Sequence, residues 1–184
     1  EQQAGIGFES RLKAHLNKKS PTIAETQSVI KRLIAKPTTK QTRMVVDAVA
    51  RKHPGSDPKV MLVMLEGLTR VARKGEISLG QRVNPLKKLL KHPDNSVAAA
   101  AAANLGAWQL KGSDPDLSAV LNDSTRASSV RRAAAISLGQ LRKPEITRIL
   151  EKLALDGETT ERYLALFGLV ETDIQAAAEA AAKL

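Results

Sequence analysis

An internal repeat constrains the fold of this chain more than any other feature of its sequence. Residues 97–106 and 130–139 share one Ala-rich pattern, and residues 161–169 repeat it at nearly the same interval along the chain. A shorter Leu-rich segment precedes each copy, at 85–91, 115–121 and 145–155. A unit of two helices joined by a polar turn cannot bury its apolar faces alone, so such units stack side by side. The repeat therefore predicts an all-α superhelix.

Apolar side chains recur at helical spacing along the rest of the chain as well, with short polar stretches between the segments. This spacing predicts helices over residues 8–18, 21–35, 39–52, 57–74, 84–91, 94–110, 114–122, 126–142, 145–155, 159–170 and 173–184. Connections of a few residues force consecutive helices to lie antiparallel. We therefore expect a single domain over 1–184, built of about five antiparallel helix pairs and a C-terminal helix.

Four prolines follow a residue that can cap a helix, namely Ser20, Asp57, Asn84 and Asp114. The polar side-chain oxygen accepts a free backbone N–H, and proline at the first helical position has no N–H to leave unbonded. Each of these pairs predicts a helix start, and the longest loop is expected near residues 74–83.

Composition excludes several kinds of protein and site. The chain has no Cys, which excludes a disulfide scaffold, an iron–sulfur cluster and a thiolate zinc site. Its four aromatic residues are too few for a typical all-β fold. His15, His53 and His92 form no metal-binding pair on one helix, and no apolar run is long enough to cross a membrane. We expect no catalytic residue, no metal site and no cofactor.

The long segments of the repeat carry a recognisable order of residues. An Asp in the turn is followed by Val130-Arg131-Arg132-Ala133-Ala134 and then by Leu138-Gly139 in the fullest copy. This order resembles the short, phycobilisome-lyase-like HEAT repeat, an armadillo-type α-solenoid. The resemblance covers residues 85–169 well and residues 1–74 only as helical pairs. We therefore expect irregular basic helix pairs over 1–75, and HEAT-like repeats with a capping helix over 84–184.

The HEAT resemblance also implies a role for the arginines near the start of the longer helices. In such stacks each arginine reaches the turn Asp or Asn of the preceding unit, which forms a structural ladder between units. The implied ladder pairs Arg131 with Asp94 or Asn95, and Arg162 with Asp123. The first copy departs from the pattern, because Ala98 stands where the arginine is expected. The alternative is a groove that binds anions through Arg131 and Arg132.

A second resemblance rests on Asn104–Trp108 and on Thr172–Ala178. Both segments are similar to the helical region of large, predicted membrane-bound dehydrogenases, where it lies between a propeller and a c-type haem domain. The resemblance implies a helical spacer within a larger multidomain protein, in an extracytoplasmic location. The chain starts at Glu1 and not at Met, which also leads us to expect a segment of a longer protein.

Charge divides the chain into two unequal halves. Residues 1–92 hold 19 Lys and Arg against 7 Asp and Glu, a net +12, whereas residues 93–184 hold 10 against 12, a net −2. A basic half can meet nucleic-acid phosphates, an acidic protein surface or an acidic membrane surface. Phe8 is its only aromatic residue, so platforms for stacking single-stranded bases are missing. The candidate interaction surface comprises Lys31, Arg32, Arg51, Arg70 and Arg73, with Arg132 in the other half.

These observations predict a non-catalytic helical-repeat scaffold or protein-interaction module. Its partner is a protein or a neighbouring domain of the same polypeptide. The alternative is a HEAT-like protein that binds nucleic acid through its basic N-terminal half.

Overall fold

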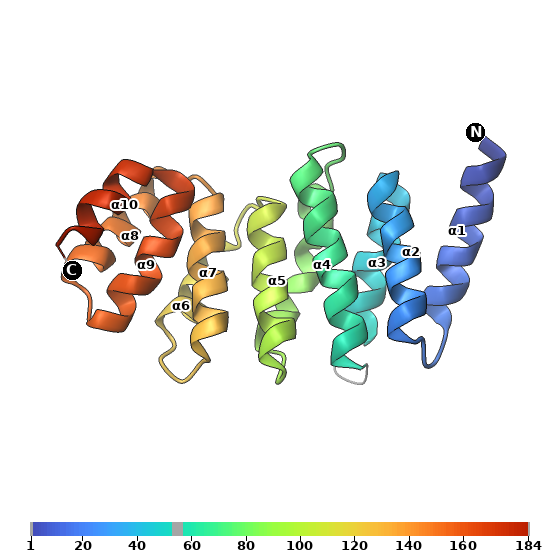
Figure 1. Ribbon diagram of the computed structural model, residues 1–184, viewed down its shortest axis with the longest axis horizontal. Coiled ribbons are helices and arrows are strands. Elements are labelled where there is room, and N and C mark those ends of the chain that lie inside the picture. Colours follow the sequence, from blue (N-terminus) through green and yellow to red (C-terminus); the bar gives the residue numbers. More distant parts are fainter. Residues whose placement is uncertain (1, 53–56, 184) are drawn as a thin grey trace.

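The computed structural model describes residues 2–52 and 57–183, and every regular element within these ranges is helical (Figure 1). The helices in chain order are α1 (Gln2–Asn17), α2 (Ile23–Ala35), α3 (Thr39–Lys52), α4 (Pro58–Lys74), η1 (Gly80–Lys91), α5 (Asn95–Ala107), α6 (Asp114–Asn122), α7 (Ser128–Gln140), α8 (Pro144–Asp156), α9 (Thr159–Thr172) and α10 (Ile174–Ala181). The predicted all-α class is therefore confirmed.

The helices form two layers along an elongated molecule, with the N-terminus and the C-terminus at opposite ends (Figure 1). The second helices of the pairs, α2, α4, α5, α7 and α9, pack side by side in what we call the second-helix layer. The first helices, α1, α3, η1, α6 and α8, form what we call the first-helix layer, in which α1 lies at the N-terminal end against α2 and α3. α10 packs on α8 and α9. Within the described residues this gives five pairs and a C-terminal helix, as the repeat predicts.

The core lies between the two layers and follows the apolar spacing of the sequence. In α4 the buried side chains Met61, Met64, Leu65 and Leu68 lie on one face, as a helix half-covered by neighbours requires. In α5 the buried face includes Ala98, Ala101, Ala102 and Gly106, and these small residues let the axes of neighbouring helices approach closely.

Proline-based prediction of helix starts succeeds at one position and needs correction at three. Asp57 caps α4, because its carboxylate accepts the Lys59 backbone N–H at 2.9 Å. The cap of α2 is Thr22 and not Ser20, since Thr22 forms a capping box with Glu25. Asp114 lies inside α6, where its carboxylate pairs with Lys143.

The third correction concerns η1, which begins at Gly80 and not after Asn84, so the loop is shorter than predicted. The helix is a 3₁₀-helix with Pro85 inside it. Proline has no N–H to donate inside a helix, and it disfavours the α conformation for Asn84 before it, so a regular α-helix is disfavoured here.

Candidate functional site

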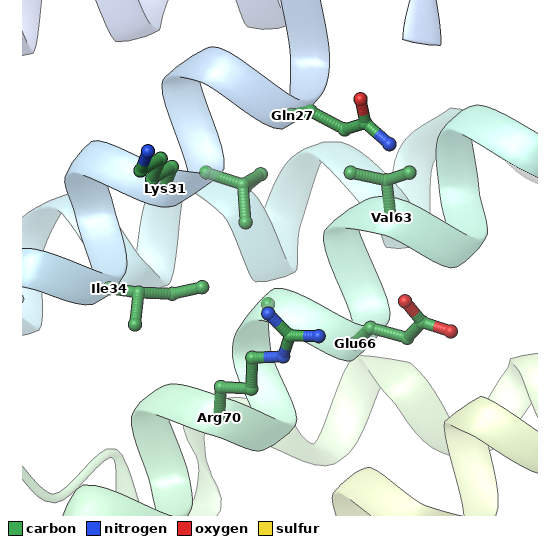
Figure 2. A pocket seen from close by; sticks show the side chains of 8 residues that line it. Gln27, Lys31, Ile34, Val63, Glu66 and Arg70 are labelled. Atoms are coloured by element: carbon green, nitrogen blue, oxygen red, sulfur yellow. The ribbon is translucent and has the colours of Figure 1, made fainter. Parts of the chain in front are cut away.

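A cleft opens on the second-helix layer between α2 and α4 (Figure 2). Its volume is about 390 Å³, enough for a few side chains of a docked segment. Ile34 of α2 and Val63 of α4 give it apolar walls, and Lys31 and Arg70 flank these walls on the two helices. The cleft thus combines apolar walls with one cation on each of the two helices.

A close contact between Ile30 and Gly67 lies in the floor of the cleft. Gly67 of α4 faces Ile30 of α2, and a Cβ atom added at Gly67 would overlap with the Ile30 Cγ2 atom. The branched side chain of Ile30 therefore fills the space that a closer approach of the two helices would need. Both residues line the cleft.

The charge around the cleft is mainly positive. Lys31 and Arg70 are exposed, and Glu66 and Gln27 are the other polar side chains that line the cleft. Glu25, at the start of α2, is already engaged, since its carboxylate accepts hydrogen bonds from Lys18 and from the Thr22 backbone. The hydrogen bond from Lys18 is the main cause that lowers the pKa of Glu25 to about 2. An incoming carboxylate would thus find two cations and one competing acid.

The structure distributes the predicted basic surface over several places. Lys31 and Arg70 share the cleft. Arg32 points to the α1 side, with its guanidinium 5.0 Å from the centre of the Phe8 ring. Arg51 lines a separate groove between α1 and α3, in the first-helix layer. Arg73 is exposed in the last turn of α4.

Arg132 lies near the opposite end of the molecule, on α7. Its guanidinium is 5.4 Å from the centre of the Phe167 ring of α9. The six predicted residues therefore do not form one continuous patch.

The ladder implied for Arg131 and Arg162 needs correction, because the structure bonds both arginines to backbone carbonyls. Arg131 Nε donates to the Leu121 carbonyl at the end of α6 at 2.8 Å, and Arg162 Nε donates to the Ala154 carbonyl of α8 at 3.2 Å. Unbonded carbonyls at the end of a helix are strong acceptors for a cation. The C-terminus of the preceding helix is therefore the partner, and the turn acid of the preceding unit is not.

The acids of the implied ladder serve their own turns. Asp94 caps α5 by accepting the Ser96 and Val97 backbone N–H groups, and Asn95 is the exposed first residue of that helix. Asp123 accepts from the hydroxyl and backbone N–H of Thr125, and these bonds lower its pKa.

An arginine does link successive units, but sequence analysis missed it. Arg126, in the turn after α6, donates to the Leu90 carbonyl near the end of η1. Ala98 is the repeat equivalent of Arg162, and Leu90 precedes Ala98 by the same interval that separates Ala154 from Arg162. The Leu90 carbonyl is therefore the equivalent of the Ala154 carbonyl that Arg162 binds. Arg126 thus supplies the guanidinium where Ala98 replaces the usual arginine. No sequence signal marks this link, since its acceptor is a backbone atom.

A second set of contacts joins the second helices through small side chains at equivalent repeat positions. Asn104 Nδ2 donates to the Leu65 carbonyl at 2.9 Å, and Ser137 Oγ donates to the Ala102 carbonyl at 2.8 Å. At the next junction the equivalent residue is Gly168, whose added Cβ atom would lie 2.6 Å from the Ala135 carbonyl oxygen. These positions demand small residues because backbone atoms lie directly against them.

Two of the histidines also make contacts within the fold. His15 Nε2 lies 3.1 Å from Thr26 Oγ1, and His92 Nδ1 accepts the Asp94 backbone N–H. His53 lies outside the described residues. In the part of the chain that the structure describes, no group of three or more His, Asp or Glu is placed to hold a metal ion. No helix in this part is long and apolar enough to cross a membrane.

Comparison with known families now adds to this geometry. Residues 83–170 match the family model of HEAT repeats. This part of the chain is a HEAT-repeat solenoid. No curated protein matches the chain.

The HEAT match begins within η1 and ends within α9, so the cleft between α2 and α4 lies outside it. The second-helix layer nevertheless continues without interruption from α2 to α9 (Figure 1). HEAT repeats generally serve as helical scaffolds for protein interactions and are typically non-catalytic.

Proposed function

We propose that this chain is a non-catalytic interaction scaffold whose cleft between α2 and α4 holds an acidic, amphipathic segment of a partner protein. The observation that carries the proposal is the pairing of apolar walls, Ile34 and Val63, with the exposed cations Lys31 and Arg70. An amphipathic helix inserts apolar side chains into such a groove, and its flanking charges set orientation and partner choice.

The rest of the fold supports this function by holding the two walls rigidly. α4 packs against α5 as well as α2, and its buried face extends into the common core. A partner therefore meets a preformed surface, which lowers the entropic cost of binding. The division into 1–75 and 84–184, the dehydrogenase resemblance and the extracytoplasmic location it implies remain predictions.

Charge reversal in the cleft tests the proposal. The probe is a fluorescent synthetic peptide of repeated Glu-Glu-Leu-Leu units, titrated against the full chain by fluorescence anisotropy. Lys31→Glu and Arg70→Glu are each expected to weaken binding about tenfold, because each turns an attraction at the cleft into a repulsion. Arg148→Glu, at an exposed cation on α8, is the matched control and should leave the affinity unchanged.

The nucleic-acid alternative is an outcome of the same experiment. Duplex DNA should compete weakly with the peptide, and Lys31→Glu should affect its binding no more than Arg148→Glu does. If duplex DNA binds more tightly than the acidic peptide and its affinity falls steeply with salt, the chain is a nucleic-acid-binding protein and the proposal is wrong.

A further inference from the structure

A stripe of exposed apolar side chains runs along α9 at the C-terminal end of the solenoid. Tyr163, Phe167 and Val170 are 55%, 42% and 55% exposed, and Ile174 continues the stripe at the start of α10. Tyr163, Phe167 and Val170 are four and three positions apart, which places them on one face of α9, whereas Ile174 lies beyond the extended residue Asp173, in α10. Among the described residues, every large apolar side chain with comparable exposure lies on α8, α9 or α10. The N-terminal half has no such surface in its described part.

The repeat shows what this face of α9 is shaped to contact. Gly106 of α5 contacts Ser137 of α7, and its equivalent on α7, Gly139, contacts Gly168 of α9. The register that aligns 130–139 with the third copy of the repeat makes Val170 the next equivalent position. Each second helix therefore uses this position to contact the following one. On α9 the same position is exposed, because α10 packs against α8 and α9 and leaves it open.

The junction between α2 and α4 shows which residue on a facing helix accommodates a branched side chain between two second helices. Ile30 faces Gly67 there, and no larger residue fits without displacing Ile30. Val170 is branched in the same way, so we expect a helix that packs on it to present a small residue, and glycine fits with the least displacement. The Ala135 carbonyl lies against Gly168, and in the repeat register Leu166 is the equivalent of Ala135. The glycine of the docked helix would therefore lie against the Leu166 carbonyl.

Charge adds a second requirement for the partner helix. Residues 157–184 hold five Asp and Glu against two Lys and Arg. The net charge of these residues is therefore −3, and Arg132 of α7, over the Phe167 ring, adds one cation on the α7 side of the stripe. A helix with basic side chains flanking its apolar face complements this end of the molecule.

We propose that the α9 stripe is a docking site for a basic amphipathic helix that presents glycine opposite Val170 and extends the second-helix layer by one helix. This site is distinct from the cleft between α2 and α4, which takes an acidic segment. The chain would thus bind two partners of opposite charge at its two ends.

A peptide with the sequence of α4 supplies the probe, because α4 is basic, amphipathic and receives a branched side chain at Gly67. The fluorescent peptide Pro58–Lys74 is titrated against the full chain, together with a Gly67→Leu version. The native peptide should bind, and the Gly67→Leu peptide should bind at least about tenfold more weakly, since leucine overlaps with Val170. Equal binding of both peptides would overturn the proposal.

Two variants of the chain locate the binding site. Val170→Asp should weaken binding of the α4 peptide at least about tenfold, with an unchanged circular dichroism spectrum, because Val170 is exposed. Ile149→Asp, at an equally exposed residue of α8, is the matched control and should bind like the unmodified chain. Unchanged binding to Val170→Asp contradicts the proposal. So does a dimer in analytical ultracentrifugation that Val170→Asp dissociates, since the stripe would then hold a second copy.

Discussion

The junction between α7 and α9 and the junction between α2 and α4 occupy equivalent places in the second-helix layer, yet they are built differently. At α7–α9, Gly139 and Gly168 bring backbone against backbone, and a Cβ atom added at Gly139 would overlap with the Gly168 carbonyl oxygen. At α2–α4, Gly67 meets the side chain of Ile30. The first junction is closed, and the second leaves a cleft of about 390 Å³.

The recognisable repeats and the cleft between α2 and α4 lie in different parts of the chain. Closed junctions need Ala, Gly and Ser at fixed positions, and these residues produce the repeat that residues 83–170 share with HEAT proteins. The open junction permits larger and charged side chains, so it departs from the repeat and gains a surface with its own chemistry. The partner that we propose therefore binds at the less regular of the two junctions.

The largest expected effect contrasts the two glycine contacts directly. Gly139→Ala should lower the free energy of unfolding by about 3 kcal/mol, because the new methyl group meets a backbone carbonyl that cannot move alone. Gly67→Ala should cost less than about 1 kcal/mol, since Ile30 can shift toward the cleft and alanine favours the helix. Urea denaturation of both variants measures this. An equal or larger loss for Gly67→Ala would break the comparison.

An intermediate effect is expected at Arg131, which is 6% exposed and holds the closed half together. Arg131→Ala should cost about 2 kcal/mol, because it leaves the Leu121 carbonyl without its charged donor. Arg148→Ala, at an exposed arginine of α8, should change stability by less than about 0.5 kcal/mol. Thermal unfolding of the two variants provides the measurement. An unchanged melting temperature for Arg131→Ala would favour an anion-binding role for this arginine.

The smallest expected effect is the pH dependence of stability that the Lys18–Glu25 pair gives to the N-terminal half. The pKa of Glu25 is lowered to about 2, chiefly by Lys18, so its ionised form stabilises α2. This contribution is complete above the ordinary glutamate pKa of about 4.3 and disappears as the pH falls toward about 2. The melting temperatures of the unmodified chain and of Glu25→Gln should therefore converge over this window. A constant difference between them would show that the Lys18–Glu25 pair does not contribute.

The layered fold was predictable because its causes are local or periodic: helical apolar spacing, short connections and a repeat of nearly constant length. The helix cap at Thr22 was harder to predict, since Ser20 and Thr22 both offer a capping hydroxyl. The partners of Arg131 and Arg126 could not be predicted, because they are backbone carbonyls that leave no trace in the sequence. The cleft is lined by Ile30 and Gly67, which lie far apart in the sequence, and only the packing of α2 on α4 reveals their contact.

Hydrogen exchange of the full chain with and without the Glu-Glu-Leu-Leu peptide tests the central claim most directly, because it locates the bound segment without any substitution. Occupation of the cleft should slow exchange in residues 27–34 and 63–70, the stretches that line it, and leave residues 83–170 unchanged. Slower exchange confined to residues 83–170, or spread evenly over the chain, would contradict the account.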